Sequence, residues 1–197
     1  NENICRLDYY VFEKVCQCLR RWMDNGIQPV PIAVNLSRAH VKNPDFLEEF
    51  AKTKERYAIP DGMLELELTE SIFFDEEQRE LGKQGIDKMH AEGFLCSLDD
   101  FGVVFSALAL LKEFNVDTIK LDRQFFLDID SEKSRSIIAA FLRLGEKLNI
   151  HIVAEGIETK KQLDYLKSVR CNMVQGYIFS KPLPIPDFEK WRKERGE

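Results

Sequence analysis

The sequence predicts an α/β fold, a (β/α) barrel of the TIM type, and three observations support this prediction. Short apolar segments alternate with longer segments of helical periodicity, as in parallel strands joined by helices. Six of the apolar segments end in a polar residue at intervals of 20 to 35 residues, about the length of one strand–helix unit. Within the strands, polar side chains fall on the face opposite the leucines and isoleucines.

The first predicted elements are a helix, a strand and a second helix. Apolar residues at helical spacing predict a helix over residues 7–23, and Asn25-Gly26 ends it because glycine is common just past a helix C-terminus. Residues 31–36 alternate in character and predict a strand. Asn43-Pro44, followed by acidic residues, predicts a helix over 44–57, since proline and acids both suit the first turn.

The middle of the chain continues this alternation. Leucine and glutamate alternate from Leu64 to Leu68, which predicts a strand over 63–68. The next expected elements are a helix over 76–91 ended by Gly93, a strand over 94–98, a short helix over 106–114 and a strand over 116–121.

The last third begins with a long amphipathic helix over 132–148 and a strand over 151–154. Thr159 is the predicted N-cap of a helix over 159–168, because a threonine hydroxyl accepts a hydrogen bond from the first helical turn. Residues 171–175 predict a short strand, and 186–193 predict a closing helix.

Composition limits the classes of function. The chain is 44% apolar and 31% charged, as in a globular domain, and its net charge of −6 argues against a nonspecific DNA-binding surface. No apolar stretch approaches the ~18 residues of a membrane span, so no membrane contact is expected. Five cysteines without a C-x-x-C pair indicate reduced thiols in a cytoplasmic protein.

The number of strands predicts an incomplete barrel. A TIM-type barrel has eight strands in roughly 250 residues, whereas six are predicted in these 197 residues. We expect one domain, over residues 1–197, that lacks about the first two strands of its barrel and forms part of a larger signalling protein. Part of the active site is expected on the missing strands.

The polar strand ends predict one acidic site, because barrel strands bring their C-terminal ends together at one mouth. Oxygen ligands of this kind suit Mg²⁺ or Mn²⁺, and one lysine among acids suits a phosphate. These ends are Asn35, Glu67, Asp99-Asp100, Lys120-Leu121-Asp122, Glu155 and Gln175.

Each residue also has a structural interpretation. Asp99-Asp100 could be a solvated turn, Asn35 could cap a turn, and Lys120 with Asp122 could form an ion pair inside the barrel. Glu65 lies one layer deeper than the mouth and is expected to be structural.

Six motifs in order resemble the EAL-domain family of bacterial phosphodiesterases, which hydrolyse cyclic di-GMP. The resemblance covers essentially the whole chain, although the Glu-Ala-Leu tripeptide, with one metal-ligating glutamate, is absent and is expected on the missing first strand. The motifs are VNLS (34–37), ELTES (67–71), DDFG (99–102), IKLD (119–122), AEGIET (154–159) and QGY with SKP (175–177 and 180–182).

This resemblance implies a role for each matching position. Metal ligands for two Mg²⁺ or Mn²⁺ ions, in the family's manner, are implied at Asn35, Glu67, Asp99 and Asp100. Catalytic roles are implied for Glu155 as general base, Lys120 at the water or phosphate oxygen, and the metal-bridging Asp100. Substrate-side positions are implied at Asp122, Gln175 and Asn35, and Glu70 is implied to brace the loop after the paired aspartates.

The resemblance implies hydrolysis of cyclic di-GMP to linear pGpG, homodimerisation, and fusion to sensor or GGDEF domains. One segment departs from the family. After Asp-Asp-Phe-Gly the family loop continues Thr-Gly-Tyr-Ser-Ser, whereas this chain has Val-Val-Phe-Ser-Ala over Val103–Ala107. Two functions therefore stay open, a metal-dependent phosphodiesterase and a catalytically weak receptor or protein-interaction module.

Overall fold

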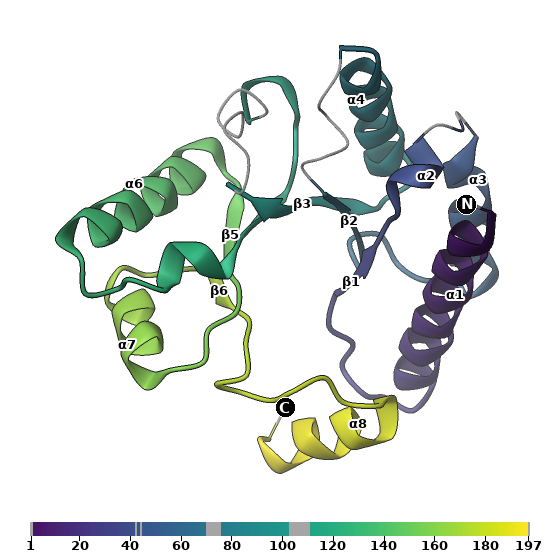
Figure 1. The fold of residues 1–197 in the computed structure, drawn as a ribbon. Coiled ribbons are helices and arrows are strands. Elements are labelled where there is room, and N and C mark those ends of the chain that lie inside the picture. Colours follow the sequence, from purple (N-terminus) through teal and green to yellow (C-terminus); the bar gives the residue numbers. More distant parts are fainter. Residues whose placement is uncertain (1, 42, 44, 70–75, 103–110, 197) are drawn as a thin grey trace.

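The computed structural model describes residues 2–41, 43, 45–69, 76–102 and 111–196. Six parallel strands form a single sheet in chain order, and the sheet curves into part of a barrel (Figure 1). The strands are β1 (Ile32–Asn35), β2 (Leu64–Thr69), β3 (Leu95–Phe101), β4 (Thr118–Leu121), β5 (His151–Ala154) and β6 (Met173–Val174).

Helices cover the outside of this sheet, as the strand–helix alternation predicts (Figure 1). The longer ones are α1 (Glu2–Asp24), α3 (Phe46–Arg56), α4 (Glu76–Ala91), α6 (Glu132–Leu148), α7 (Lys160–Ser168) and α8 (Ile185–Glu194). Two single-turn helices, α2 (Arg38–Val41) and η2 (Arg123–Phe126), follow β1 and β4.

Several boundaries differ from the predicted ones. Strand β3 runs three residues beyond the predicted end at Leu98, because a bulge lets Phe101 pair with Leu121. The last strand is shorter than the predicted 171–175, and α2 and η2 were not predicted. Most of the predicted helix over 106–114 lies outside the described residues. Within its described part, residues 111–113 are helical.

Side-chain parity in the strands separates the core from the barrel interior. Leu64, Leu66 and Leu68 are buried beneath the helices at 1% exposure or less, which confirms the predicted apolar face of β2. The opposite face of this strand carries Glu65 and Glu67 into the cavity of the barrel. The same alternation holds on β4, where Thr118 and Lys120 line the cavity.

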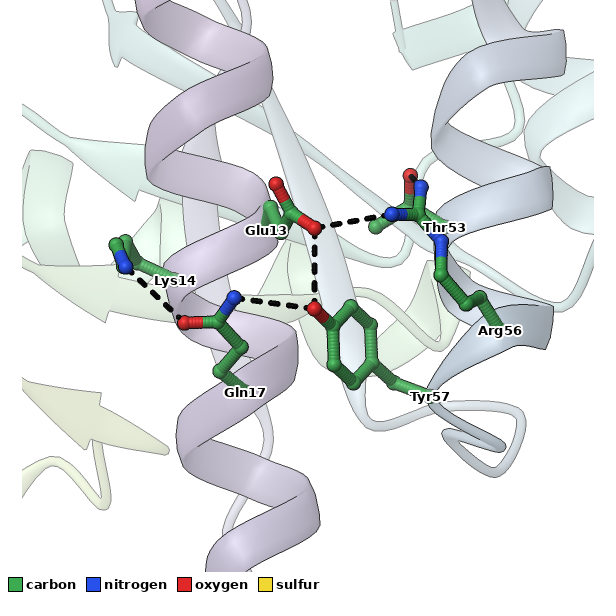
Figure 2. A network of polar contacts seen from close by, with 6 residues as sticks. All are labelled: Glu13, Lys14, Gln17, Thr53, Arg56 and Tyr57. Carbon is green, nitrogen blue, oxygen red and sulfur yellow. Dashed lines mark hydrogen bonds and ion pairs between the residues drawn. The ribbon is translucent and has the colours of Figure 1, made fainter.

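Helix α1 is attached to α3 by a polar network on the outer surface, shown in Figure 2. Glu13 accepts hydrogen bonds from Tyr57 Oη and Arg56 Nη1, both at 3.0 Å, and Gln17 Nε2 donates to Tyr57 Oη at 3.0 Å. Beneath this network Phe12 packs edge-to-face on Phe50, with ring centroids 4.8 Å apart. Polar and aromatic contacts together fix the two helices against each other.

All five cysteines are free thiols, in agreement with the predicted reduced state. In the part of the chain that the structure describes, no helix combines the length and apolar character that crossing a membrane requires.

Candidate functional site

Lys120 lies at the centre of three carboxylates at the mouth of the partial barrel. Its Nζ is 2.9 Å from Glu67 Oε1, 3.1 Å from Asp99 Oδ1 and 2.9 Å from Glu155 Oε1. The four side chains come from β4, β2, β3 and the end of β5, so the parallel sheet brings together residues that are up to 88 positions apart, from 67 to 155. This convergence is the one expected from the sequence.

The four side chains are largely withdrawn from water. The side chains of Lys120 and Glu67 are 8% exposed, and those of Asp99 and Glu155 are 15% and 16% exposed. Ion pairs at this depth are screened by solvent far less than surface pairs. The alternative interpretation was an ion pair between Lys120 and Asp122. The ion pairs of Lys120 are instead with the three carboxylates described above.

Burial and mutual charge set the protonation of this cluster. Burial alone would lower the pKa of Lys120, but the charge of Glu67 and hydrogen bonds to Glu155 and Glu67 outweigh it, so the pKa is raised. Burial raises the pKa of Glu67 and of Glu155, and Lys120 opposes that rise in both. The lysine is therefore held as an ammonium ion, and Glu155 is a carboxyl group with an increased affinity for protons.

The paired aspartates lie in the bulge of β3, between Leu98 and Phe101, and differ in exposure. Asp99 lies on the inward face beside Lys120, whereas Asp100 is exposed and has a φ of 55°, in the left-handed region. The backbone N–H of Asp100 donates to Asp99 Oδ1 at 3.0 Å. Partial burial, followed by the charges of Asp99 and Asp122, raises the pKa of Asp100, although its side chain is largely exposed.

Asp122 has a structural contact that the sequence interpretation did not include. Its Oδ1 accepts a hydrogen bond from the backbone N–H of Gln124 at 2.9 Å and so caps η2. Asp122 also lines a cavity of about 890 Å³ together with Glu155 and Gln175. It therefore faces the same open space as the predicted base.

Asn35 and Gln175 lie at the two edges of the sheet, and both are exposed at the mouth. They line a cavity of about 1,530 Å³ that also receives Glu67 and Lys120. Gln175 lines the smaller cavity as well, so the two cavities adjoin at this residue.

Below the mouth lies a second polar layer. Thr118 Oγ1 donates to Glu65 Oε2 at 3.4 Å, in line with the structural role expected for Glu65. Ser97, on the strand between them, is fully buried, and its Oγ has no hydrogen-bond partner among the described residues. Strand parity alone was enough to place Glu65 in this layer.

The three carboxylates around Lys120 have the oxygen donors that a divalent metal ion needs. Glu67, Asp99 and Glu155 offer the carboxylate oxygens that Mg²⁺ and Mn²⁺ prefer, all three within 3.1 Å of one point, the nitrogen of Lys120. Across the described ranges, however, no three or more His, Cys, Asp and Glu side chains are arranged as a metal centre. The donors therefore fit a divalent metal by their oxygen chemistry, whereas in this structure the positive charge between them is the ammonium group of Lys120.

Two predicted features fall outside the described residues. They are Glu70, with its expected bracing role, and the divergent loop Val103–Ala107.

Comparison with known proteins shows the family of this chain. The EAL domain family model matches residues 2–182. The cyclic di-GMP phosphodiesterase NbdA of Pseudomonas aeruginosa is 32% identical over 192 residues, which are 97% of this chain and 24% of that protein. MucR of the same organism, a bifunctional diguanylate cyclase and cyclic di-GMP phosphodiesterase, is 32% identical over 92% of this chain and 26% of its own length. The chain thus spans about a quarter of the length of these curated relatives.

Solved structures show the same fold. The EAL domain of Mycobacterium smegmatis DcpA superposes with a TM-score of 0.86 at 28% identity, over 95% of this chain and 84% of that one. A manganese and cyclic di-GMP complex of Klebsiella pneumoniae BlrP1 superposes with a TM-score of 0.80 at 26% identity, over 92% of this chain and 46% of that one.

Proposed function

The chain belongs to the EAL-domain family, and from that premise we propose that it is a metal-dependent phosphodiesterase that hydrolyses cyclic di-GMP to linear pGpG. The observation that carries the proposal is the convergence of Glu67, Asp99 and Glu155 on Lys120 at one barrel mouth. A binding module needs no buried lysine surrounded by carboxylates, whereas a hydrolase needs a proton acceptor, oxygen ligands and a cation for phosphate.

The proposed roles follow from the chemistry of each side chain. Glu67 and Asp99, with Asn35 and Asp100, would hold Mg²⁺ or Mn²⁺, two ions in the full site. When bound, such ions neutralise phosphate charge and make water more acidic. Glu155 accepts the proton of the attacking water, a task that its raised pKa favours. Lys120 presents a fixed positive charge to a phosphate oxygen.

The cavities support a dinucleotide as the substrate. A space of about 1,530 Å³ adjoins a second of about 890 Å³ at Gln175, and Asp122 and Glu155 line the second. We propose that the scissile phosphate lies beside Lys120 and Glu155, with Asp122, Gln175 and Asn35 on the substrate side. The complex of BlrP1 with manganese and cyclic di-GMP supports this choice of ligands.

The activity is tested by following pGpG formation by chromatography with cyclic di-GMP and Mn²⁺. Glu155→Gln should abolish turnover, because an amide cannot accept the proton, while cyclic di-GMP binding measured by calorimetry is retained. Glu146→Gln, on the exposed surface of α6, is the matched control and should turn over like the parent. Product formation that persists in excess EDTA, or equal turnover by Glu155→Gln, would contradict the mechanism.

The second candidate is a catalytically weak receptor or a protein-interaction module, favoured by the divergent Val103–Ala107 segment. Binding of cyclic di-GMP without any pGpG in Mn²⁺ would select the receptor. We also propose that the barrel is one domain of a larger cytoplasmic signalling protein, that it forms a homodimer, and that a sensor or GGDEF domain is attached. The bifunctional relative MucR supports the last point.

A further inference from the structure

The single-turn helix η2 lies between the two backbone turns that carry the paired aspartates and Glu155. It follows β4 directly and begins after Asp122, whose side chain caps it. One residue of η2 contacts Gly102, two positions after Asp100, and another contacts Gly156, which follows Glu155. The sequence motifs and the strand alternation predict no role for this segment.

The contact with Gly102 is so close that no side chain fits there. A Cβ atom at Gly102 would lie 2.4 Å from the ring carbons Cε2 and Cζ of Phe125, well inside van der Waals contact. Gly102 also has a φ of 93°, which side chains disfavour. The ring of Phe125 therefore packs directly on the backbone of the turn that follows Asp99 and Asp100.

This turn needs an external support. Asp100 has a φ of 55° and lies in the bulge of β3. A left-handed residue other than glycine costs on the order of 1–3 kcal/mol and persists only where the surrounding structure enforces it. Phe125 belongs to η2 and not to β3, and its ring packs against this turn.

Phe125 is itself held in place. Its ring meets Phe141 of α6 edge-to-face at 5.6 Å, and Phe141 meets Phe101 of β3 at 6.0 Å. The next residue, Phe126, is fully buried, and its carbonyl accepts a buried hydrogen bond from Gln162 Nε2 at 3.0 Å. Helix η2 is thus anchored on α6 through Phe125 and on α7 through Phe126.

Helix η2 also supports the second turn, the one that carries Glu155. A Cβ at Gly156, where φ is 65°, would lie 2.5 Å from Cβ of Arg123. Because Arg123 and Phe125 belong to one helical turn, a shift of η2 moves the supports of both turns together.

We propose that Phe125 is a positioning residue: its ring holds the Asp99–Asp100 turn in its left-handed conformation and, through η2, couples that turn to the turn of Glu155. Only the catalytic consequence rests on the proposed function, because the packing itself is a property of the fold. Phe125 touches no reacting group in this scheme. It acts by keeping two carboxylate-bearing turns in register.

The decisive measurement is hydrogen–deuterium exchange of the intact chain, because it does not depend on activity. Phe125→Ala should speed exchange in peptides covering residues 99–102 and 153–157, and Phe125→Leu, which keeps part of the apolar volume, should speed it less. Phe12→Leu is the matched control, since Phe12 is a buried ring on α1, away from both turns. Phe125→Leu is compared with it, so that the proposal stays testable if the alanine variant does not fold.

The functional measurements are Mn²⁺ titration by calorimetry and turnover across Mn²⁺ concentrations. Phe125→Ala should weaken Mn²⁺ binding about tenfold and lower kcat on the order of 100-fold, the effect of displacing a catalytic group by about 1 Å. Phe125→Leu should fall between the parent and Phe125→Ala in both measurements.

Parent-like exchange at residues 99–102 in both Phe125→Ala and Phe125→Leu would overturn the proposal, whatever the activity. Faster exchange there in Phe12→Leu to the same degree would also overturn it, because the effect would then be general. If the parent protein neither binds Mn²⁺ nor hydrolyses cyclic di-GMP, the proposed function fails, and the exchange result alone decides the role of Phe125.

Discussion

At the scale of single residues, the stability of the site depends on one buried charge. Lys120 is 6% exposed and is the partner of three carboxylates, so its ammonium group offsets the cost of burying them. The same arrangement explains why the acidic residues sit close together although few solvent molecules reach them. A residue with a proposed catalytic role is thus also a structural one.

Lys120→Met should destabilise the protein at neutral pH. Removing one partner of a buried ion pair leaves an uncompensated charge and costs about 3–5 kcal/mol. Without the ammonium, the pKa values of Glu67 and Glu155 rise further above their ordinary 4.5. A carboxyl group whose folded pKa is raised destabilises the fold above its unfolded pKa, and this cost falls as pH drops through the folded pKa, so the deficit should shrink as pH falls from 7.5 towards 5.5.

Urea unfolding of Lys120→Met at both pH values measures this. Lys52→Met is the control, because Lys52 makes only an exposed pair with Glu48, at 2.9 Å, and should leave stability nearly unchanged. An equal deficit at pH 7.5 and 5.5 would show that lost packing, and not charge, dominates.

His40 gives a second prediction for one residue, on the far side of α1. It is 3% exposed, packs between the rings of Tyr9 and Phe50, and lies 3.0 Å from Asp8 Oδ2. Burial lowers its pKa below the ordinary 6.5, and Asp8 opposes this only in part. Because the unfolded chain binds the proton more readily, stability should fall as pH drops below about 6.5.

His40→Gln should remove this part of the pH dependence between pH 7 and 5.5, as measured by thermal unfolding. His151→Gln, at an exposed position, is the control and should keep the slope of the parent. Identical slopes in the parent and His40→Gln would refute the prediction.

At the scale of elements, local signals and tertiary contacts decide different structures. Helix α7 illustrates a local signal: Thr159 and Gln162 form a capping box, as the predicted N-cap requires. Thr159→Ala should therefore cost about 1 kcal/mol of unfolding free energy. Lys160→Ala, with a side chain 87% exposed, is the control and should be nearly neutral in the same urea titration. A neutral Thr159→Ala would mean that packing of α7 alone sets its first turn.

The contrast with the single-turn helices shows what the sequence can predict. Helices α4 and α6 have the predicted bounds, because their apolar periodicity is long and their C-terminal signals are clear. Helices α2 and η2 have four residues each and no periodicity to detect. They depend on tertiary partners, such as the pairing of His40 with Asp8 and the buried hydrogen bond from Gln162 to Phe126.

The site divides in the same way. Strand parity and the register of parallel strands predicted that Glu67, Asp99, Lys120 and Glu155 converge, because both are regular. The left-handed Asp100 was not predictable, since it follows from a bulge and from the ring of Phe125. Nor did the sequence indicate that Lys120 would lie at the centre of the cluster.

At the scale of the whole molecule, the C-terminal end of α1 meets the last helix, α8, across the open side of the sheet (Figure 1). Strands β1 and β6 are its edges, and α8 lies beside the end of α1 (Figure 1). Glu189 of α8 accepts a hydrogen bond from Trp22 Nε1 at 2.7 Å and pairs with Arg21. Arg192 donates to the carbonyl of Gln28 at 2.6 Å. These contacts join the first helix to the last.

Disrupting this junction should lower the stability of the whole fold. Glu189→Ala leaves Trp22 Nε1, on a ring that is 2% exposed, without its acceptor, and losing a hydrogen bond to a charged group costs about 1.5–3 kcal/mol. For a chain of this size each kcal/mol lowers Tm by about 2–4 °C. Glu194→Ala is the matched control, because its pair with Lys190, at 4.0 Å, is exposed and should contribute little.

The pH dependence of this junction distinguishes the charge from the packing. Hydrogen bonds from Trp22 and Arg21 lower the pKa of Glu189 below its ordinary 4.5. A depressed acid stabilises the fold above its unfolded pKa, and that contribution is lost as pH falls through the folded value. The difference in Tm between parent and Glu189→Ala should therefore be largest above about pH 5 and should narrow below pH 4. A difference that is constant with pH would assign the junction to the stacking of Trp22 on Phe188, at 6.1 Å, instead of to the carboxylate.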